Sequence, residues 1–240
     1  MAEKRKETAG DAQAFTTREF IETLLKINPE YGERKAYRTL QHLQEQGRIT
    51  KVSRGHYTFK ISRKVYRYRA SALMKSVRRQ IEAAFPKCEF QIFELQQFNE
   101  FLRHPLDYNA VFVETAHGYE EKVSDMLRGG DAMVMRDPDY SRFQRYRTDE
   151  VIVVRRLITD SPSPCPGSKT ASLEKLLVDL FSKKLTGRLI DRGEYRHLFE
   201  EAFSRYSINE KSMFRYARRR SQEKEIVSFI AEETLIHLMI

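Results

Sequence analysis

Cysteines and long apolar runs are scarce in this sequence of 240 residues. The two cysteines, Cys88 and Cys165, have no second Cys and no His at metal-ligand spacing, so neither a disulfide scaffold nor a zinc ribbon is expected. The longest aliphatic run, residues 151–154, is far shorter than the ~20 residues that cross a bilayer. No apolar segment follows the basic N-terminus, so a secretory signal is not expected either. These absences predict a cytoplasmic protein that does not bind a membrane.

Acidic side chains are also scarce in residues 31–70. The whole chain has 43 Lys and Arg against 34 Asp and Glu, a formal charge of +9. Residues 31–70 hold 11 basic and 2 acidic side chains, so this segment alone accounts for a charge of +9. Positive charge concentrated in one short segment is typical of a module that binds a polyanion. A solvated basic surface is the alternative, so the arrangement of these residues has to decide.

The apolar spacing predicts two helices and a hairpin in the N-terminal region. Residues 15–19 have the pattern of a hydrophobic staple and a capping box, which predicts a helix that stops at 28–29. A second helix is predicted over residues 33–46. A hairpin is predicted next, with strands over 48–53 and 56–60 on either side of an Arg-Gly turn.

This order of elements is typical of a winged helix-turn-helix domain, which we predict over residues 1–68. Its second helix would enter the major groove, where Arg pairs with guanine and Gln with adenine. Its hairpin would reach phosphates or the minor groove. The predicted DNA-binding residues are Arg34, Lys35, Arg38, Gln41 and His42 on the helix, and Lys51, Arg54 and His56 on the hairpin. A domain that binds only protein is the alternative.

A mixed α/β domain with a helical C-terminal extension is predicted over residues 70–240, so the predicted fold class is α+β or α/β. Strands are predicted over 90–95, 110–115, 132–135 and 151–157. Helices are predicted over 70–85, 96–103, 119–127, 172–184, 195–205 and 210–238, the last with a break near Ser221. A Pro-rich linker over 160–170 separates the half that contains the sheet from the helical tail.

Several short motifs resemble the AbiEi-type antitoxin family of type IV (abortive infection) toxin–antitoxin systems. The motifs are Tyr37-Arg38-x-Leu40, Gly47-x-Ile49, Arg54-Gly55-x-Tyr57, Ile92-Phe93-Glu94, Phe98-Asn99-x-Phe101 and the strand-like segment 111–114. Residues 173–180, LEKLLVDL, are similar to the most recognisable block of that family. The similarity extends from about Phe15 to Arg220. Phe93 stands where relatives often have Trp, and Ala171-Ser172 where Pro commonly precedes the block.

The resemblance implies a bacterial protein that represses its own operon through the winged helix. Its partners would be the double-stranded DNA of the operator and a cognate nucleotidyltransferase-like toxin, which such antitoxins need not bind in a stable complex. We expect no enzymatic activity, no cofactor and no metal. Glu174, Lys175 and Asp179, at the edge of the leucine stripe in the family-like block, are the candidates for antagonising the toxin. The alternative is that these charges cap the helix, pair with one another or contact a neighbouring loop.

Two other functions stay open. One is a nucleic-acid enzyme, such as a nuclease, targeted by the winged helix. Three sequence patterns resemble parts of such enzymes, but each is incomplete or unspecific. Residues 167–170 resemble the end of a P-loop but lack its upstream glycine, and Arg192 and His197 have a spacing that charged helices produce by chance. Glu114 could belong to a nuclease-like set, but Ala116 stands where that set would need Lys. The other is a transcription regulator that senses a ligand, which would need a closed polar pocket in the C-terminal domain.

Overall fold

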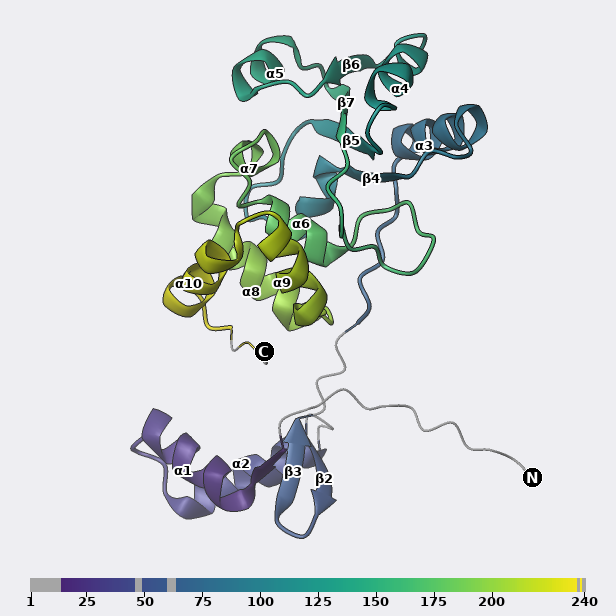
Figure 1. The fold of residues 1–240 in the computed structure, drawn as a ribbon. Helices are drawn as coiled ribbons and strands as arrows, with labels where there is room; N and C mark the ends of the chain where they lie inside the picture. Colours follow the sequence, from purple (N-terminus) through teal and green to yellow (C-terminus); the bar gives the residue numbers. More distant parts are fainter. Residues whose placement is uncertain (1–13, 46–48, 60–63, 237, 239–240) are drawn as a thin grey trace, which may run out of the picture. The chain divides into compact units, whose positions relative to one another are not determined.

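The computed structural model describes residues 14–45, 49–59, 64–236 and 238 (Figure 1). The chain divides into two compact units, Met1–Arg63 and Lys64–Ile240. The described part is mixed α+β, as predicted, with one small sheet in each unit. None of its helices is both long and apolar enough to cross a membrane.

The first unit contains the two predicted helices and the predicted hairpin. Its elements are β1 (Ala14–Thr16), α1 (Thr17–Ile27), α2 (Glu33–Glu45), β2 (Ile49–Ser53) and β3 (His56–Phe59). The strands form an antiparallel sheet in the order β1-β3-β2, so β1 is a third strand that was not predicted. Gln46, Arg48 and Lys60, at the predicted ends of these elements, lie outside the described residues.

The start of α1 confirms the predicted cap. The carboxylate of Glu19 accepts from the backbone N–H of Thr16 (2.7 Å), and the Thr16 hydroxyl accepts from the N–H of Glu19 (3.2 Å). The rings of Phe15 and Phe20 stack with their centroids 5.7 Å apart, which is the predicted staple. The hairpin turns at Gly55, whose φ of +76° lies in the left-handed region. Short-range chemistry therefore fixes both the entry to α1 and the tip of the hairpin.

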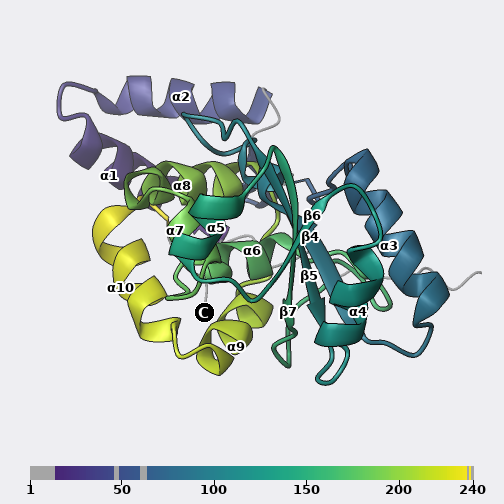
Figure 2. The ribbon, with the colours of Figure 1, turned by 90° about the horizontal axis from the view of Figure 1, so that it is seen from above.

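The second unit is built on a mixed four-stranded sheet (Figure 2). Its strands are β4 (Phe90–Glu94), β5 (Asn109–Thr115), β6 (Met133–Arg136) and β7 (Glu150–Arg156), in the order β4-β5-β7-β6. β5, β7 and β6 run parallel, and β4 is antiparallel to β5. Every residue of β4 and β5 is buried, because helices cover both faces of the sheet.

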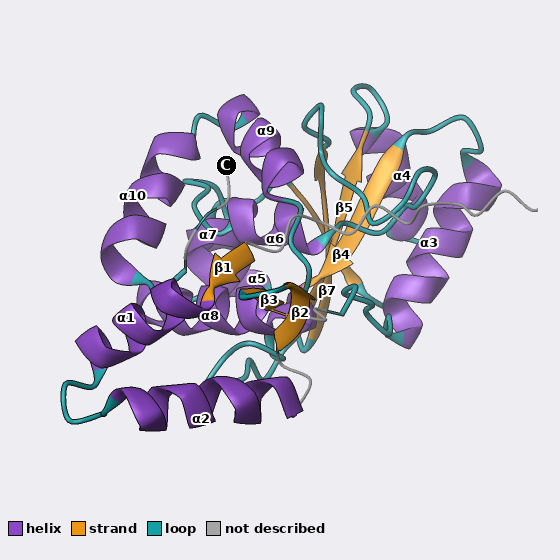
Figure 3. Ribbon diagram, turned by 90° about the horizontal axis from the view of Figure 1, so that it is seen from below, coloured by secondary structure: helices purple, strands orange, loops and turns teal. Residues whose placement is uncertain are grey.

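The helices form one layer on each side of this sheet (Figure 2; Figure 3). α3 (Ala72–Ala84) and α4 (Glu120–Leu127) pack on one face, where Val77 and Val123 meet Val111 and Val113. The other face packs against α5 (Tyr140–Tyr146), α6 (Leu173–Asp179), α7 (Thr186–Leu189), α8 (Tyr195–Arg205), α9 (Glu210–Arg219) and α10 (Glu223–Glu233). The helical tail therefore shares a hydrophobic core with the sheet.

Two helices predicted in this unit were wrong in type or length, and the helix α5 was missed. The predicted helix 96–103 is a short 3₁₀ helix, η1 (Leu95–Phe98), because the side chains of Gln97 and Asn99 bond to nearby backbone groups and compete with a longer helix. α5 was not predicted, since Phe143 is its only buried residue and leaves no apolar period. The predicted helix 172–184 ends at Asp179. A Cβ on Gly187 would lie 2.0 Å from the carbonyl oxygen of Ser182, so the chain turns back closely there.

The Pro-rich segment is a connection within the second unit. Beside it, the N–H of Ile92 donates to the carbonyl of Lys169 (2.7 Å), and the N–H of Ala171 donates to the carbonyl of Ile92 (3.0 Å). The amide of Gln91 donates to the carbonyl of Ser161 (3.1 Å). Both ends of the segment are thus attached to β4, and the segment carries the chain across to α6.

The predicted break near Ser221 is confirmed and is a Schellman motif at the end of α9. The N–H of Ser221 donates to the carbonyl of Arg218 (3.0 Å), the N–H of Gln222 donates to the carbonyl of Ala217 (2.9 Å), and the φ of Ser221 is +56°. A residue with a Cβ destabilises the folded state by about 1–2 kcal/mol when its backbone lies in this left-handed region. Glycine avoids that strain, but it also gives the unfolded chain more backbone freedom, which offsets part of the gain in stability.

We therefore expect Ser221→Gly to raise the free energy of unfolding by about 0.5–1 kcal/mol, measured by urea denaturation. Ser228, an exposed residue in the middle of α10, is the matched control. Ser228→Gly should lower the same free energy by about 0.5 kcal/mol, because glycine is a poorer helix former than serine. A destabilised Ser221→Gly variant would contradict the assignment of the motif.

Candidate functional site

All eight predicted DNA-binding residues are exposed on the first unit. Five of them lie on α2, away from its buried residues Ala36 and Leu40, and the other three lie on the β2–β3 hairpin. Together they form a surface that we call the basic surface: Arg34, Lys35, Arg38, Gln41, His42, Lys51, Arg54 and His56. The 3.6-residue period of the helix explains the first group, since Arg34, Arg38 and Gln41 follow one another at i, i+4 and i+7.

Most cations of the basic surface are not neutralised by neighbouring acids. Within the described residues, no carboxylate lies within 4 Å of Arg34, Arg38, Lys51 or Arg54. The ammonium of Lys35 lies 3.7 Å from the centre of the Tyr31 ring. His42 Nδ1 and a carboxylate oxygen of Glu45 are 3.9 Å apart. His56 Nδ1 lies 3.1 Å from the carbonyl oxygen of Arg54 at the hairpin tip. The surface therefore presents unpaired positive charge to solvent, which suits a polyanion.

One exposed aromatic residue on this surface was not proposed as a site residue from the sequence. Tyr37, next to Arg38 on α2, has 51% of its surface exposed. A large ring on a solvated helix face departs from the usual burial of such side chains. The sequence does indicate its exposure, because Tyr37 lies outside the apolar stripe formed by Ala36, Leu40 and Leu43.

The family-like block is placed differently from the prediction. Lys175 and Asp179 do not lie at the edge of the leucine stripe, because both are fully buried. Glu174 is half-buried, and its carboxylate accepts from the backbone N–H of Asn209 (2.9 Å), at the start of α9. The structure therefore agrees with the alternative hypothesis, in which these charges pair with one another and contact a neighbouring loop. Lys175 and Asp179 present no surface to a partner in this fold.

Lys175 and Asp179 belong to a cluster of buried charges whose members are far apart in the sequence. Lys175 Nζ lies 2.9 Å from Glu114 Oε2 and 2.5 Å from Asp179 Oδ2. Arg155 donates from Nε to Glu114 Oε1 (2.8 Å), and the Tyr216 hydroxyl donates to Asp179 Oδ1 (3.0 Å). We call Glu114, Arg155, Lys175, Asp179 and Tyr216 the buried charge cluster. Arg220, at the end of α9, adds a cation 3.5 Å from Asp179 Oδ1, and Thr186 accepts from Arg155 (2.7 Å).

Electrostatic pairing favours the charged forms of Asp179 and Arg155 despite their burial. Burial acts to raise the pKa of the Asp179 carboxyl, but the nearby charges of Lys175, Arg220 and Arg155 outweigh it and hold the pKa below its ordinary value. Burial acts to lower the pKa of Arg155, and the carboxylates of Glu114 and Asp179 reverse that effect. Burial and then the Asp179 charge raise the pKa of the Tyr216 hydroxyl. Acids and bases are thus matched inside a low-dielectric region.

The buried charge cluster joins secondary-structure elements. Glu114 and Arg155 are paired neighbours near the ends of the parallel strands β5 and β7. Lys175 and Asp179 come from α6, and Tyr216 from α9. Lys175 and Arg155 also lie over the stacked rings of Phe93 and Phe112. Because these groups are buried and paired with one another, the cluster holds the helical layer on the sheet.

Two residues of the enzyme-like patterns, Arg192 and Glu114, have structural contacts. The Arg192 guanidinium lies 4.6–4.9 Å from the ring centres of Phe181, Tyr195 and Phe229, so it caps an aromatic cluster. Glu114 is in the buried charge cluster. In the part of the chain that the structure describes, no group of three or more His, Cys, Asp or Glu residues could hold a metal ion.

Comparison with models of protein families gives a match over most of the chain. The model of a family described as a family of unknown function, DUF6577, matches residues 36–236. The matched segment begins within α2 and extends past α10, so it leaves out α1. No curated protein matches the chain.

Proposed function

This chain belongs to the DUF6577 family, whose function is unknown, and from its own residues we propose that it is a DNA-binding transcriptional regulator. The proposal rests on the basic surface, where Arg34, Arg38, Lys51 and Arg54 are exposed with no carboxylate within 4 Å among the described residues. The order β1-α1-α2-β2-β3, with an antiparallel three-stranded sheet, supports a winged helix-turn-helix as the module that carries this surface.

The two parts of the basic surface have different roles in this proposal. α2 enters the major groove, where Arg38 reads guanine and Gln41 reads adenine. The β2–β3 hairpin acts as the wing, with Lys51 and Arg54 on phosphates. Phosphate contacts position the protein, and base contacts select the sequence. A site of this kind combines a strong dependence on salt with a smaller, sequence-dependent gain in affinity.

The proposal is tested by titrating the full chain into a labelled duplex that covers the region upstream of its own gene. We expect the logarithm of the affinity to fall linearly with the logarithm of salt concentration, by about 0.9 for each phosphate that is neutralised. A duplex of scrambled sequence should bind more weakly with a similar slope. Absence of binding to both duplexes at low salt would overturn the proposal.

The narrower proposal is that this regulator is a bacterial, cytoplasmic antitoxin that represses its own operon and antagonises a nucleotidyltransferase-like toxin. It rests on the resemblance of residues 173–180 and of the N-terminal motifs to AbiEi-type antitoxins. The full chain should then restore growth to cells that express the neighbouring gene from an independent promoter. If it binds the upstream DNA but does not restore growth, the antitoxin part is lost and the regulator remains.

A further inference from the structure

β6 lies at the edge of the sheet in the second unit. It pairs with β7 on one side, and no strand among the described residues pairs with its other side. An edge strand carries backbone N–H and C=O groups that are free to pair with another extended chain. Met133, at its start, has 39% of its surface exposed.

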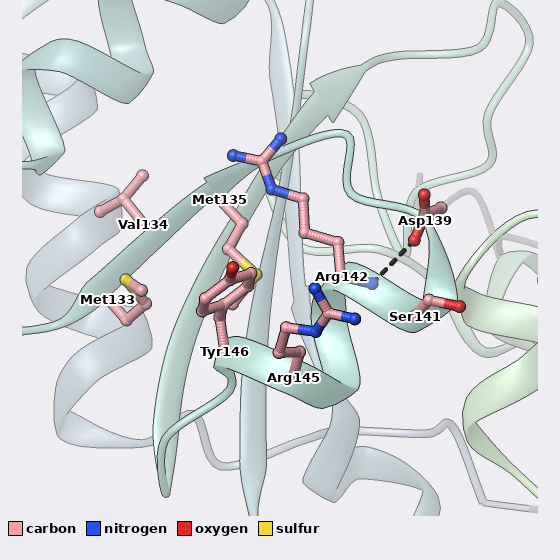
Figure 4. A pocket seen from close by; sticks show the side chains of 8 residues that line it. All are labelled: Met133, Val134, Met135, Asp139, Ser141, Arg142, Arg145 and Tyr146. Carbon is pink, nitrogen blue, oxygen red and sulfur yellow. Dashed lines mark hydrogen bonds between the residues drawn. The ribbon is translucent and has the colours of Figure 1, made fainter.

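Both faces of the sheet are hollowed beside this edge. On the side of α5 there is a cavity of about 600 Å³, lined by Met135, Arg142, Arg145 and Tyr146 among others (Figure 4). On the side of α3 and α4 there is a cavity of about 930 Å³, whose wall includes Leu73, Val77 and Leu127. Met133 and Val134 of β6 line both cavities. The edge therefore offers a side-chain pocket on each face of the sheet.

The two cavities differ in charge. Arg142 and Arg145 are exposed and, within the described residues, have no carboxylate within 4 Å. Asp139, which also lines the α5 cavity, is engaged as the cap of α5 and accepts from the backbone N–H of Arg142 (2.7 Å). The wall of the other cavity has the carboxylates of Asp131, Asp149 and Glu150, and its one arginine, Arg128, is paired with Asp125. Among the described residues of the two walls, the arginines without a carboxylate within 4 Å are therefore those on the α5 side.

We propose that the β6 edge binds an extended acidic segment of a partner protein as an added strand. Successive side chains of a strand point to opposite faces, so acidic side chains would meet Arg142 and Arg145 while the alternate, apolar ones enter the α3–α4 cavity. Backbone hydrogen bonds along residues 133–136 supply affinity, and the two pockets supply specificity. The carboxylates of Asp131, Asp149 and Glu150 repel acidic side chains from the α3–α4 cavity, so the acidic positions of the segment face α5. This inference does not depend on DNA binding by the first unit.

The probe is the labelled peptide Ac-Glu-Val-Glu-Val-Glu-Val-NH₂, titrated with the full chain and followed by fluorescence anisotropy. We expect it to bind, and the same peptide with Lys in place of each Glu to bind at least about tenfold more weakly. The double variant Arg142→Glu with Arg145→Glu should weaken binding of the acidic peptide by a similar factor. Both arginines are exposed, so its melting temperature should match that of the wild type.

Lys211→Glu with Arg215→Glu is the matched control, because it makes the same charge change on exposed positions of α9. It should leave peptide binding unchanged. If both double variants weaken peptide binding equally, the effect is due to net charge alone and the proposal is overturned. The proposal is also overturned if the acidic peptide does not bind. A dimer in solution that is lost on Met133→Pro would show that a second copy of the chain occupies the edge, which also overturns it.

Discussion

Replacing Asp179 with Ala is expected to lower the free energy of unfolding by about 3–5 kcal/mol. The side chain is fully buried and pairs with Lys175, Arg220 and Arg155, so its removal leaves these three cations with a single buried carboxylate, Glu114, which contacts only Lys175 and Arg155 among them. The Tyr216 hydroxyl also loses its acceptor. Urea denaturation followed by circular dichroism measures the change. A loss below about 1 kcal/mol would contradict the pairing.

Two controls separate charge pairing from loss of volume. Glu174→Ala, five residues earlier on α6, removes a half-buried carboxylate that accepts one hydrogen bond, and should cost about 0.5–1.5 kcal/mol. Lys175→Met with Asp179→Leu removes one charge of each sign and leaves Glu114 paired with Arg155. This double variant should be more stable than Asp179→Leu alone.

The effect of Asp179 should also depend on pH. The pKa of Asp179 in the folded chain is below its ordinary value, so its contribution to stability is complete above the ordinary aspartate range near 3.9. That contribution is lost as the pH falls through the lowered pKa of the folded state. The difference in stability between the wild type and Asp179→Ala should therefore shrink at strongly acid pH.

Arg38→Ala is expected to cost about 1–3 kcal/mol of binding free energy on the cognate DNA and much less on a scrambled duplex. Arg38 is exposed in the middle of α2 and has no acidic partner among the described residues, so its guanidinium is available to a base. Gln41→Ala should behave in the same way. Equal loss on both duplexes would assign Arg38 to phosphate contact instead.

The hairpin and the second unit provide the comparison for this result. Arg54→Ala should weaken binding to every sequence and reduce the salt slope by about 0.9, because it removes one phosphate contact. Arg79→Ala changes an exposed arginine on α3 of the second unit and should alter neither affinity nor slope. An effect of Arg79→Ala as large as that of Arg54→Ala would extend the DNA interface beyond the basic surface.

Local chemistry made the first unit predictable. The cap formed by Thr16 and Glu19 and the turn at Gly55 act over a few residues, so the sequence pattern locates them directly. α8 has the predicted bounds because its apolar period is regular. The sequence did not predict η1 and α5 correctly, because neither has a regular apolar period. Hydrogen bonds from side chains to the backbone shorten η1, and a single buried residue, Phe143, anchors α5.

The buried charge cluster could not be predicted, since it depends on pairings that are distant in sequence. Glu114 and Arg155 become neighbours only through the parallel register of β5 and β7, 41 residues apart. Lys175 and Asp179 have the i, i+4 spacing of a solvated ion pair, and sequence alone does not show that a sheet covers them. The signal in the sequence was a charged residue next to the apolar run of each strand, Glu114 in β5 and Arg155 in β7.

The same cluster constrains how members of this family can diverge. Glu114, Arg155, Lys175 and Asp179 come from three separate segments, yet each neutralises another in a region that water does not reach. A lineage that loses one of them keeps an uncompensated charge in its interior until a second position changes. Substitutions at these four positions should therefore be inherited together, and relatives should fall into two groups, with the set intact or replaced by apolar residues.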